Sequence, residues 1–105
     1  MNAFAALADN TRREIVRMLA AEGELSASQI GKNFSMTAPA ISQHLKVLRQ
    51  AGIIQMEKRA QQRLYRIEEA GINEIGSWLD DIKTLWNRRF DSLDSYLLEM
   101  KSKET

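Results

Sequence analysis

The segment from Leu25 to Gly52 constrains the fold of this chain most, because it predicts a short helix, a tight turn and a longer second helix. Ser26, followed three residues later by Gln29, is a capping-box pattern that begins the first helix. Thr37 is a suitable N-cap for the second helix, whose first turn contains the only proline. Gly52 stands where a helix end favours a left-handed residue.

The second helix of this segment has one apolar and one polar face. Apolar residues recur at helical spacing and form a narrow stripe: Ile41, Leu45 and Leu48. The opposite face is polar and its only charge is positive; it carries Pro39, Gln43, Lys46 and Gln50, with Ser42 on its flank. Two close helices, one with such a face, are what a protein needs to place a helix in the DNA major groove.

Length and composition exclude several classes of protein. A chain of 105 residues is expected to form one domain, 1–105, too small for an enzyme with a deep cleft and a lid. It has no cysteine, no apolar stretch of membrane-spanning length and no signal-peptide pattern, so we expect a cytoplasmic protein without thiol chemistry. Neither an enzyme nor a cofactor is expected: Asp80 and Asp81 diverge on a helix, and there is no Ser/His/Asp set or glycine-rich phosphate loop.

The net charge of +1 hides a strong segregation of charge along the chain. Residues 25–67 contain seven basic residues and one acid, whereas residues 68–105 contain nine acids and five bases. Positive charge gathered in this way favours a polyanion as the partner. A charged stretch is often only a solvated surface, but here it coincides with the two-helix pattern. We therefore expect double-stranded DNA as the partner and no membrane association.

Three more elements are expected on either side of this segment. Residues 2–8 predict one or two helical turns, and a longer helix, capped by Asp9 or Asn10, follows to about residue 21. Residues 53–59 and 63–67 predict a hairpin whose tip is without glycine, so a tight primed turn is not expected. Such a basic tip is suited to the phosphate backbone or the minor groove; it consists of Lys58, Arg59, Gln61, Gln62 and Arg63.

One long helical pattern fills the chain from about residue 70 to 102. Apolar residues recur every three or four positions, with an extra four-residue step after Trp86: Ile72, Ile75, Leu79, Ile82, Trp86, Phe90, Leu93, Leu97 and Met100. Thirty helical residues span roughly 45 Å, whereas a globule of this length has a radius of gyration of about 13 Å. A second copy is the simplest cover for so long a stripe. A helical hairpin near residues 87–91 is the alternative.

This order of elements is that of a winged helix-turn-helix, a mainly α fold with a β hairpin, and the residues resemble the ArsR/SmtB-type family of bacterial repressors. The resemblance covers Phe4 to about Tyr96 and is carried by residues 6–13, 39–48 and 51–54, with Tyr65, Trp78 and Leu79. It implies a helix-turn-helix at about 25–52, a wing at about 53–67 and a dimerisation helix at about 70–102. It also implies a homodimeric repressor whose first and last helices form the interface: Phe4, Leu7, Ile75, Trp78, Leu79, Ile82, Trp86, Phe90, Leu93 and Leu97.

The resemblance also assigns roles on the second helix of the pair. Ser42 and Gln43 are predicted to contact base edges. Thr37, Pro39 and Lys46 are predicted to position the helix, Lys46 through a phosphate. His44 has two interpretations, a phosphate or helix-orienting contact and a purely structural role. Arg12 and Arg13 contact phosphate or pair with acids such as Glu14, and we favour a structural role.

Family members that sense metals use cysteine clusters or Asp/His sets on the terminal helices. This chain has no cysteine and one histidine, so it resembles the metal-independent branch, and no metal site is expected. Such members repress constitutively, respond to a non-metal signal or are regulated by another protein, so a small-molecule or protein inducer remains open. The main alternative function is a winged-helix module that docks a protein instead of DNA.

Overall fold

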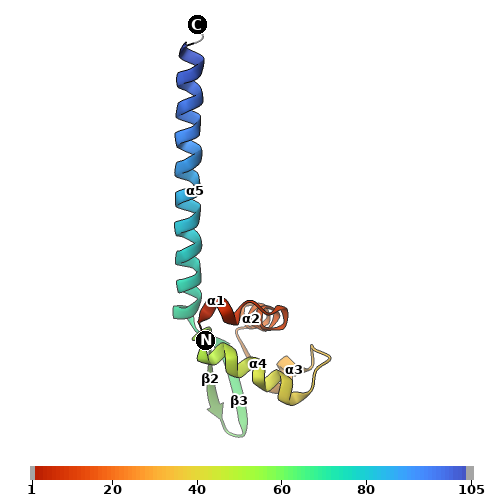
Figure 1. Ribbon diagram of the computed structural model, residues 1–105. Coiled ribbons are helices and arrows are strands. Elements are labelled where there is room, and N and C mark those ends of the chain that lie inside the picture. Colours follow the sequence, from red (N-terminus) through yellow and green to blue (C-terminus); the bar gives the residue numbers. More distant parts are fainter. Residues whose placement is uncertain (1, 104–105) are drawn as a thin grey trace. The chain divides into compact units, whose positions relative to one another are not determined.

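The computed structural model describes residues 2–103, and the side chains of residues 2–101. Figure 1 shows the elements, which are mainly helical and follow in the order α1 (Ala3–Ala6), α2 (Asn10–Glu22), β1 (Glu24–Ser26), α3 (Ala27–Gly31), α4 (Ala38–Gln50), β2 (Ile54–Arg59), β3 (Gln62–Ile67) and α5 (Glu69–Lys103). The chain divides into two compact units, residues 1–75 and 76–105. The first turns of α5 belong to the first unit, and the rest of α5 makes up the second.

The helices of the first unit begin where the sequence predicts. Asp9, and not Asn10, caps α2, since its carboxylate accepts the Arg12 backbone N–H at 3.0 Å. Ser26 and Gln29 form the predicted capping box, with hydrogen bonds of 3.2 and 2.8 Å. The Thr37 hydroxyl caps α4. These caps satisfy N–H groups that a helix leaves unpaired in its first turn.

The three strands form one antiparallel sheet in the order β1-β3-β2. The hairpin of β2 and β3 was predicted, but β1 was not, because three residues are too few to show an alternating pattern. In the register of the sheet, Leu25 of β1 and Met56 of β2 both pair with Tyr65 of β3. Ser26 ends β1 and caps α3 at the same time, so the sheet places the hairpin directly beside the helix-turn-helix.

The expectation that the hairpin lacks a tight primed turn is wrong. Arg59 pairs with Gln62, so only Ala60 and Gln61 join the strands. Ala60 has a φ of 56°, the positive sign that primed turns require at their first central residue. Glycine is the usual residue there, but the left-handed region is also accessible to other L-residues, and alanine brings only a methyl group.

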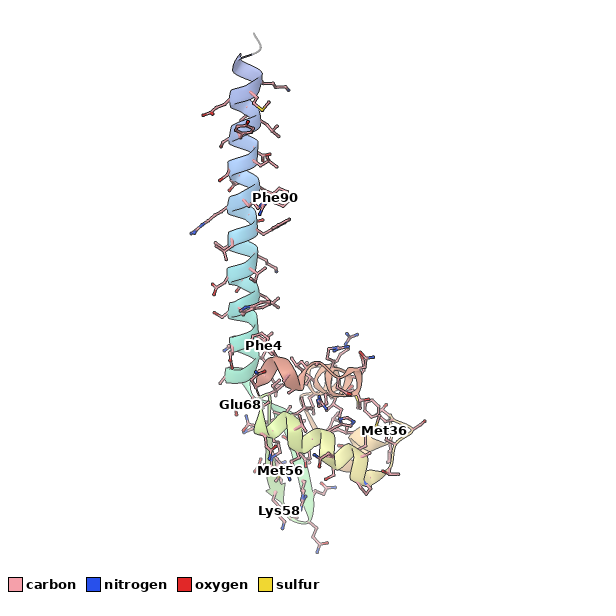
Figure 2. The ribbon with its side chains drawn as sticks, in the orientation of Figure 1. Phe4, Met36, Met56, Lys58, Glu68 and Phe90 are labelled. Atoms are coloured by element: carbon pink, nitrogen blue, oxygen red, sulfur yellow. The ribbon has the colours of Figure 1, made fainter. Side chains whose placement is uncertain are left out.

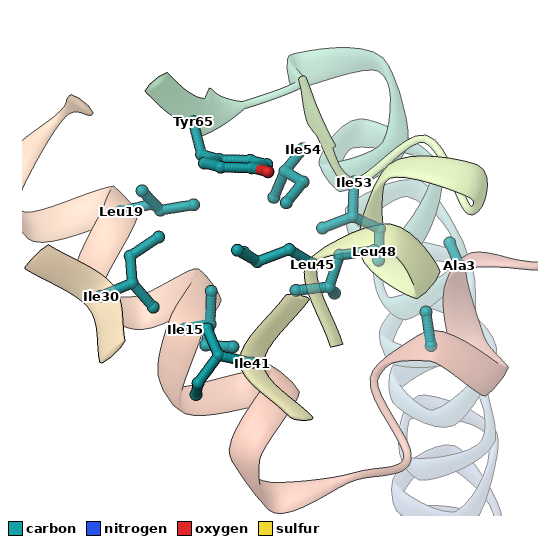
Figure 3. Close-up of a cluster of buried hydrophobic side chains, with 11 residues drawn as sticks. Ala3, Ile15, Leu19, Ile30, Ile41, Leu45, Leu48, Ile53, Ile54 and Tyr65 are labelled. Carbon is teal, nitrogen blue, oxygen red and sulfur yellow. The ribbon is translucent and has the colours of Figure 1, made fainter. Parts of the chain in front are cut away.

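The core of the first unit consists of apolar side chains from its helices and from the hairpin. The predicted stripe of α4 is buried there, together with residues of α2, α3 and the hairpin (Figure 3): Ile15, Leu19, Ile30, Ile41, Leu45, Leu48, Ile53, Ile54 and Tyr65. Because Ile41, Leu45 and Leu48 are buried on one side of α4, the polar face on its opposite side is held outward.

Residues 76–103 of the second unit form one uninterrupted stretch of helix, so the alternative of a helical hairpin near residues 87–91 is wrong. The large apolar side chains from Trp78 to Met100 are each at least 44% exposed within this chain. Trp86 and Phe90 pack edge to face with ring centroids 4.9 Å apart. Among the described residues, no helix is long and apolar enough to cross a membrane.

Candidate nucleic-acid interface

The exposed face of α4 presents the side chains of this helix that the sequence predicted for DNA contact. Pro39, Ser42, Gln43 and Lys46 are all exposed, and Thr37 is exposed immediately before the helix. Glutamine and serine can read base edges in the major groove, and lysine is suited to phosphate. α4 therefore offers a polar, positively charged face at the end of the helix that a recognition helix uses.

His44 differs from these residues, because its side chain is only 20% exposed and lies towards α2. Its Nδ1 is 3.4 Å from Nη1 of Arg12 and 3.9 Å from Oδ2 of Asp9. The contacts fit the helix-orienting interpretation of His44, since they connect the middle of α4 to the start of α2.

Arg12 and Arg13 are engaged by the end of α1. Arg12 Nε donates to the carbonyl oxygen of Ala6 at 2.6 Å, and Arg13 Nη1 donates to that of Leu7 at 2.7 Å. The suggested partner Glu14 instead lies 3.8 Å from Arg17. The backbone hydrogen bond from Arg12, with smaller contributions from the charges of His44 and Arg12, lowers the pKa of Asp9. These contacts support a structural role for both arginines.

The two faces of the wing differ in charge. Strand alternation and register place Lys58 and Arg63 opposite each other on the face of Tyr65, which is the face towards the core and α4. Arg59 lies on the other face, where it pairs with Glu57 at 3.0 Å and Glu24 at 3.2 Å.

The hydrogen bond to Glu57 and the charge of Glu24 raise the pKa of Arg59. Within the described part of the chain, neither Lys58 nor Arg63 has a carboxylate within ion-pair distance. Figure 2 shows Lys58 near the end of the hairpin. The wing face on the α4 side therefore carries two cations without an ion pair among the described residues, and Gln61 and Gln62 are exposed at the tip.

A shallow groove of about 410 Å³ separates α3 and α4 from β3. Ser42 of α4 and Arg63 of β3 both line it, and none of its lining residues is acidic. Lys32, at the end of α3, also lines the groove and adds a third cation to this side. Lys32 was not predicted as a site residue, although its place at the end of the first helix of the pair was a usable signal.

The residues predicted for the dimer interface fall in both units. Phe4 is 41% exposed, while Leu7 and Ile75 are partly buried and pack against the core. The others, from Trp78 to Leu97, belong to the exposed stripe of α5; Figure 2 labels Phe90 among them. Over the described residues, no three side chains of His, Asp or Glu come together as a metal site would require.

An anchored second helix with an exposed polar face, a preceding short helix and a wing with cations on the same side define a winged helix-turn-helix DNA-binding protein. Residues 9–56 match the family described as bacterial regulatory protein, arsR family. The chain is 35% identical over 86 residues to the HTH-type transcriptional regulator Rv2034 of Mycobacterium tuberculosis. The matched region covers 82% of this chain and 77% of the relative. This protein belongs to the ArsR family of transcriptional regulators.

Two further comparisons agree with this assignment. The transcriptional repressor SdpR of Bacillus subtilis is 32% identical over 78 residues, covering 74% of this chain and 86% of SdpR. The solved structure of an ArsR-like transcriptional regulator from Rhodococcus sp. RHA1 has a TM-score of 0.70 and 32% identity, covering 86% of this chain and 84% of that chain. The protein is accordingly a DNA-binding transcriptional regulator and not an enzyme.

Proposed function

We propose that this protein is a homodimeric repressor that binds a pseudo-palindromic operator, with α4 of each copy in the major groove. The observation that carries the proposal is the shared orientation of α4 and the wing. Ser42, Gln43 and Lys46 are exposed on α4, and Lys58 and Arg63 lie without ion-pair partners, among the described residues, on the adjacent face of the wing. Base reading and phosphate binding can then use one side of the unit.

The proposed DNA contacts are of two kinds, those to base edges and those to the phosphate backbone. Gln43 can pair with adenine through two hydrogen bonds, and Ser42 can contact either base type. Thr37 and Pro39 hold the start of α4 close to the backbone, and Lys46, Lys58 and Arg63 neutralise phosphates. Arg59 contributes less, since two carboxylates already neutralise it. His44 acts indirectly, by keeping α4 in position against Asp9 and Arg12.

The dimer follows from the exposed apolar side chains of α5, which one copy leaves uncovered. Phe4 of α1 and Leu7, which follows this helix, belong to the same predicted interface as Ile75, Trp78 and its other residues. Repression is proposed because one similar protein, SdpR, is named a transcriptional repressor. We propose a cytoplasmic location, where a regulator of this class has access to its DNA.

Regulation without metal is the second part of the proposal. The sequence has no cysteine, and its single histidine already contacts Arg12 and Asp9. A site for a sensory transition metal needs several such ligands held together. The signal that releases this repressor is therefore a non-metal compound or another protein, or the repression is constitutive.

A gel shift on the DNA upstream of the protein's own gene tests the proposal. We expect a specific complex that weakens steeply with added salt, because phosphate contacts release counterions. Gln43→Ala should relax base preference at a fixed position, whereas Lys46→Ala should weaken all sequences alike. The absence of any salt-sensitive specific complex would refute the repressor function and favour a module that docks a protein.

The wing supplies a matched pair for the same assay. Arg63→Ala should weaken binding and reduce the slope of affinity against salt by about one unit, as expected for one lost phosphate contact. Arg59→Ala should change that slope less, because Glu57 and Glu24 already pair with this guanidinium. Equal effects of the two substitutions would mean that the free face of the wing is not the one that contacts DNA.

A further inference from the structure

The groove between α3, α4 and β3 has an apolar floor. Ile41, Leu45 and Tyr65 line it, although each is otherwise buried and only 1–4% exposed. Met36, in the connection between α3 and α4, also lines the groove and is 39% exposed (Figure 2). Charged and polar groups make the contacts to the DNA backbone, so DNA binding does not explain an apolar floor.

Two cations and two hydroxyl groups accompany this floor. Lys32 and Arg63 line the groove and are exposed, and within residues 2–101 neither has a carboxylate at ion-pair distance. Ser28 and Ser42 line it as well, and their hydroxyl groups can donate hydrogen bonds. The groove is therefore complementary to a molecule with one anionic end and one apolar end.

A smaller, polar hollow of about 240 Å³ adjoins the groove and indicates where the anionic end lies. It shares Ala27, Ser28 and Arg63 with the groove, and Gln61 and Gln62 of the hairpin also line it. Arg63 therefore belongs both to the groove with the apolar floor and to the polar hollow. A guanidinium can bind the two oxygens of a carboxylate through two parallel hydrogen bonds, so Arg63 is suited to hold such a group there.

We propose that the groove binds an aliphatic carboxylate of medium chain length, and that the bound acid releases the protein from its operator. This inference rests on the proposed repressor function and names the chemical class of its signal. Arg63 and Lys32 bind the carboxylate, and the aliphatic chain lies along the apolar floor beside Met36. The volume of about 410 Å³ is within the range of small-ligand sites. The flexible thioether of a methionine can adjust to such a chain.

The acid and the operator use the same side chains. Ser42 and Arg63 line the groove and are also proposed DNA contacts. A bound acid neutralises Arg63 and covers Ser42, so the two ligands exclude each other. By linkage, each must lower the affinity of the other by the same factor. We expect saturating acid to weaken operator binding by at least about fivefold.

Methionine methyl groups measure binding at a defined place, because Met36 lines the groove and Met100 belongs to the apolar stripe of α5. The intact chain, labelled with ¹³C in its methionine methyl groups, is titrated with octanoate in the absence of DNA and followed by nuclear magnetic resonance. We expect the Met36 signal, assigned with Met36→Leu, to shift to saturation while the Met100 signal stays unchanged. A shift of Met100 with Met36 unchanged would place the acid on α5 and overturn the inference.

Two other compounds and two variants test the parts of the site separately. Acetate lacks the tail and octanamide lacks the charge, so each should bind more weakly than octanoate by at least about tenfold. Arg63→Gln should weaken octanoate binding by about tenfold. Arg66→Gln removes the same charge from the other face of β3, where Arg66 donates to Gln55, and should have no effect. Acetate binding as tightly as octanoate would mean an adventitious ion only, and octanamide binding as tightly would mean apolar contact only; either would overturn the inference.

Release from the operator is measured separately, by repeating the gel shift with and without octanoate. Met36→Gln puts a polar amide at the apolar floor and changes none of the proposed DNA contacts. This variant should bind the operator as tightly as wild type but need more octanoate for release. Saturation of the Met36 signal without loss of operator affinity, or no Met36 shift beside a normal operator complex, would overturn the inference and leave the repressor standing. The absence of any specific operator complex would refute the repressor function and the release together.

Discussion

The two units of this protein differ in how far their large apolar side chains are exposed. In the first unit Ile15, Leu45 and Ile53 are completely buried, whereas in the second each large apolar side chain from Trp78 to Met100 is at least 44% exposed. Both units have regular helical spacing of apolar residues. The spacing therefore shows which face of a helix will be buried but not what buries it. The short stripes of the first unit are buried within that unit, while the long stripe of α5 is exposed on the single chain and is the surface that the proposed dimer covers.

The largest difference should appear when a leucine is truncated in each unit. Leu45→Ala removes a fully buried side chain of α4 and should lower the free energy of unfolding by about 2–5 kcal/mol. Leu93→Ala should leave the unfolding of the first unit unchanged at concentrations where the chain is monomeric, and instead weaken dimerisation. Urea unfolding followed by circular dichroism, at several protein concentrations, measures both effects.

If Leu93→Ala lowered the stability of the first unit as much as Leu45→Ala does, the contrast between the two units would be wrong. It would mean that the stripe of α5 is already part of the core of a single chain.

Gly71 and Gly76 of α5 differ in the space around them. A Cβ on Gly71 would lie 2.1 Å from the carbonyl oxygen of Gly52, a backbone atom that cannot rotate away, whereas a Cβ on Gly76 would meet no atom within 4 Å. Gly71→Ala should therefore destabilise the protein by about 1–3 kcal/mol. Gly76→Ala should stabilise it by about 1 kcal/mol, because alanine is the better helix former.

Thermal unfolding followed by circular dichroism measures these shifts, which should have opposite signs only five residues apart. Stabilisation by both substitutions would show that the start of α5 does not pack against the turn after α4.

The smallest effect concerns the start of α2 and depends on pH. Because the pKa of Asp9 is lowered in the folded state, its contribution is present above the unfolded value of 3.8 and is lost as the pH falls through the folded value. Asp9→Ala should cost about 1 kcal/mol at neutral pH. Asp9→Asn, which keeps a capping oxygen, is the matched control.

Denaturant titrations of wild type and Asp9→Ala at pH 7 and pH 3 give this difference. It should shrink in acid, and a difference that stays constant would exclude the carboxylate as its source.

Much of the fold could be predicted because its determinants are local in the chain. Ser26 with Gln29, and Thr37 before a proline, define helix starts within four residues. The strands of the hairpin and the buried stripe of α4 follow from short-range spacing. Contacts between distant residues were not predictable in the same way. Glu24 reaches Arg59 only because β1 joins the sheet, and β1 was too short to recognise.

In the candidate site, too, the features that depend on local spacing could be predicted, and the contacts between distant residues could not. The exposure of Ser42, Gln43 and Lys46 follows from the helical period once the buried face is known. The neighbours of His44 and Arg12 do not, because they depend on how α1, α2 and α4 pack together. The sequence alone indicates that the tip of the wing is basic. The register of the strands was needed to show that Lys58 and Arg63, on the side of α4, have no ion-pair partner among the described residues.

Two copies, joined through α5, are proposed to place two α4 helices on one operator. Native mass spectrometry of the intact chain with a DNA duplex that contains the whole operator tests this most directly. Two chains per duplex should be present at saturation, and a duplex with only one half-site should bind much more weakly. One chain per full-length duplex at saturation, with equal affinity for the half-site, would contradict the account.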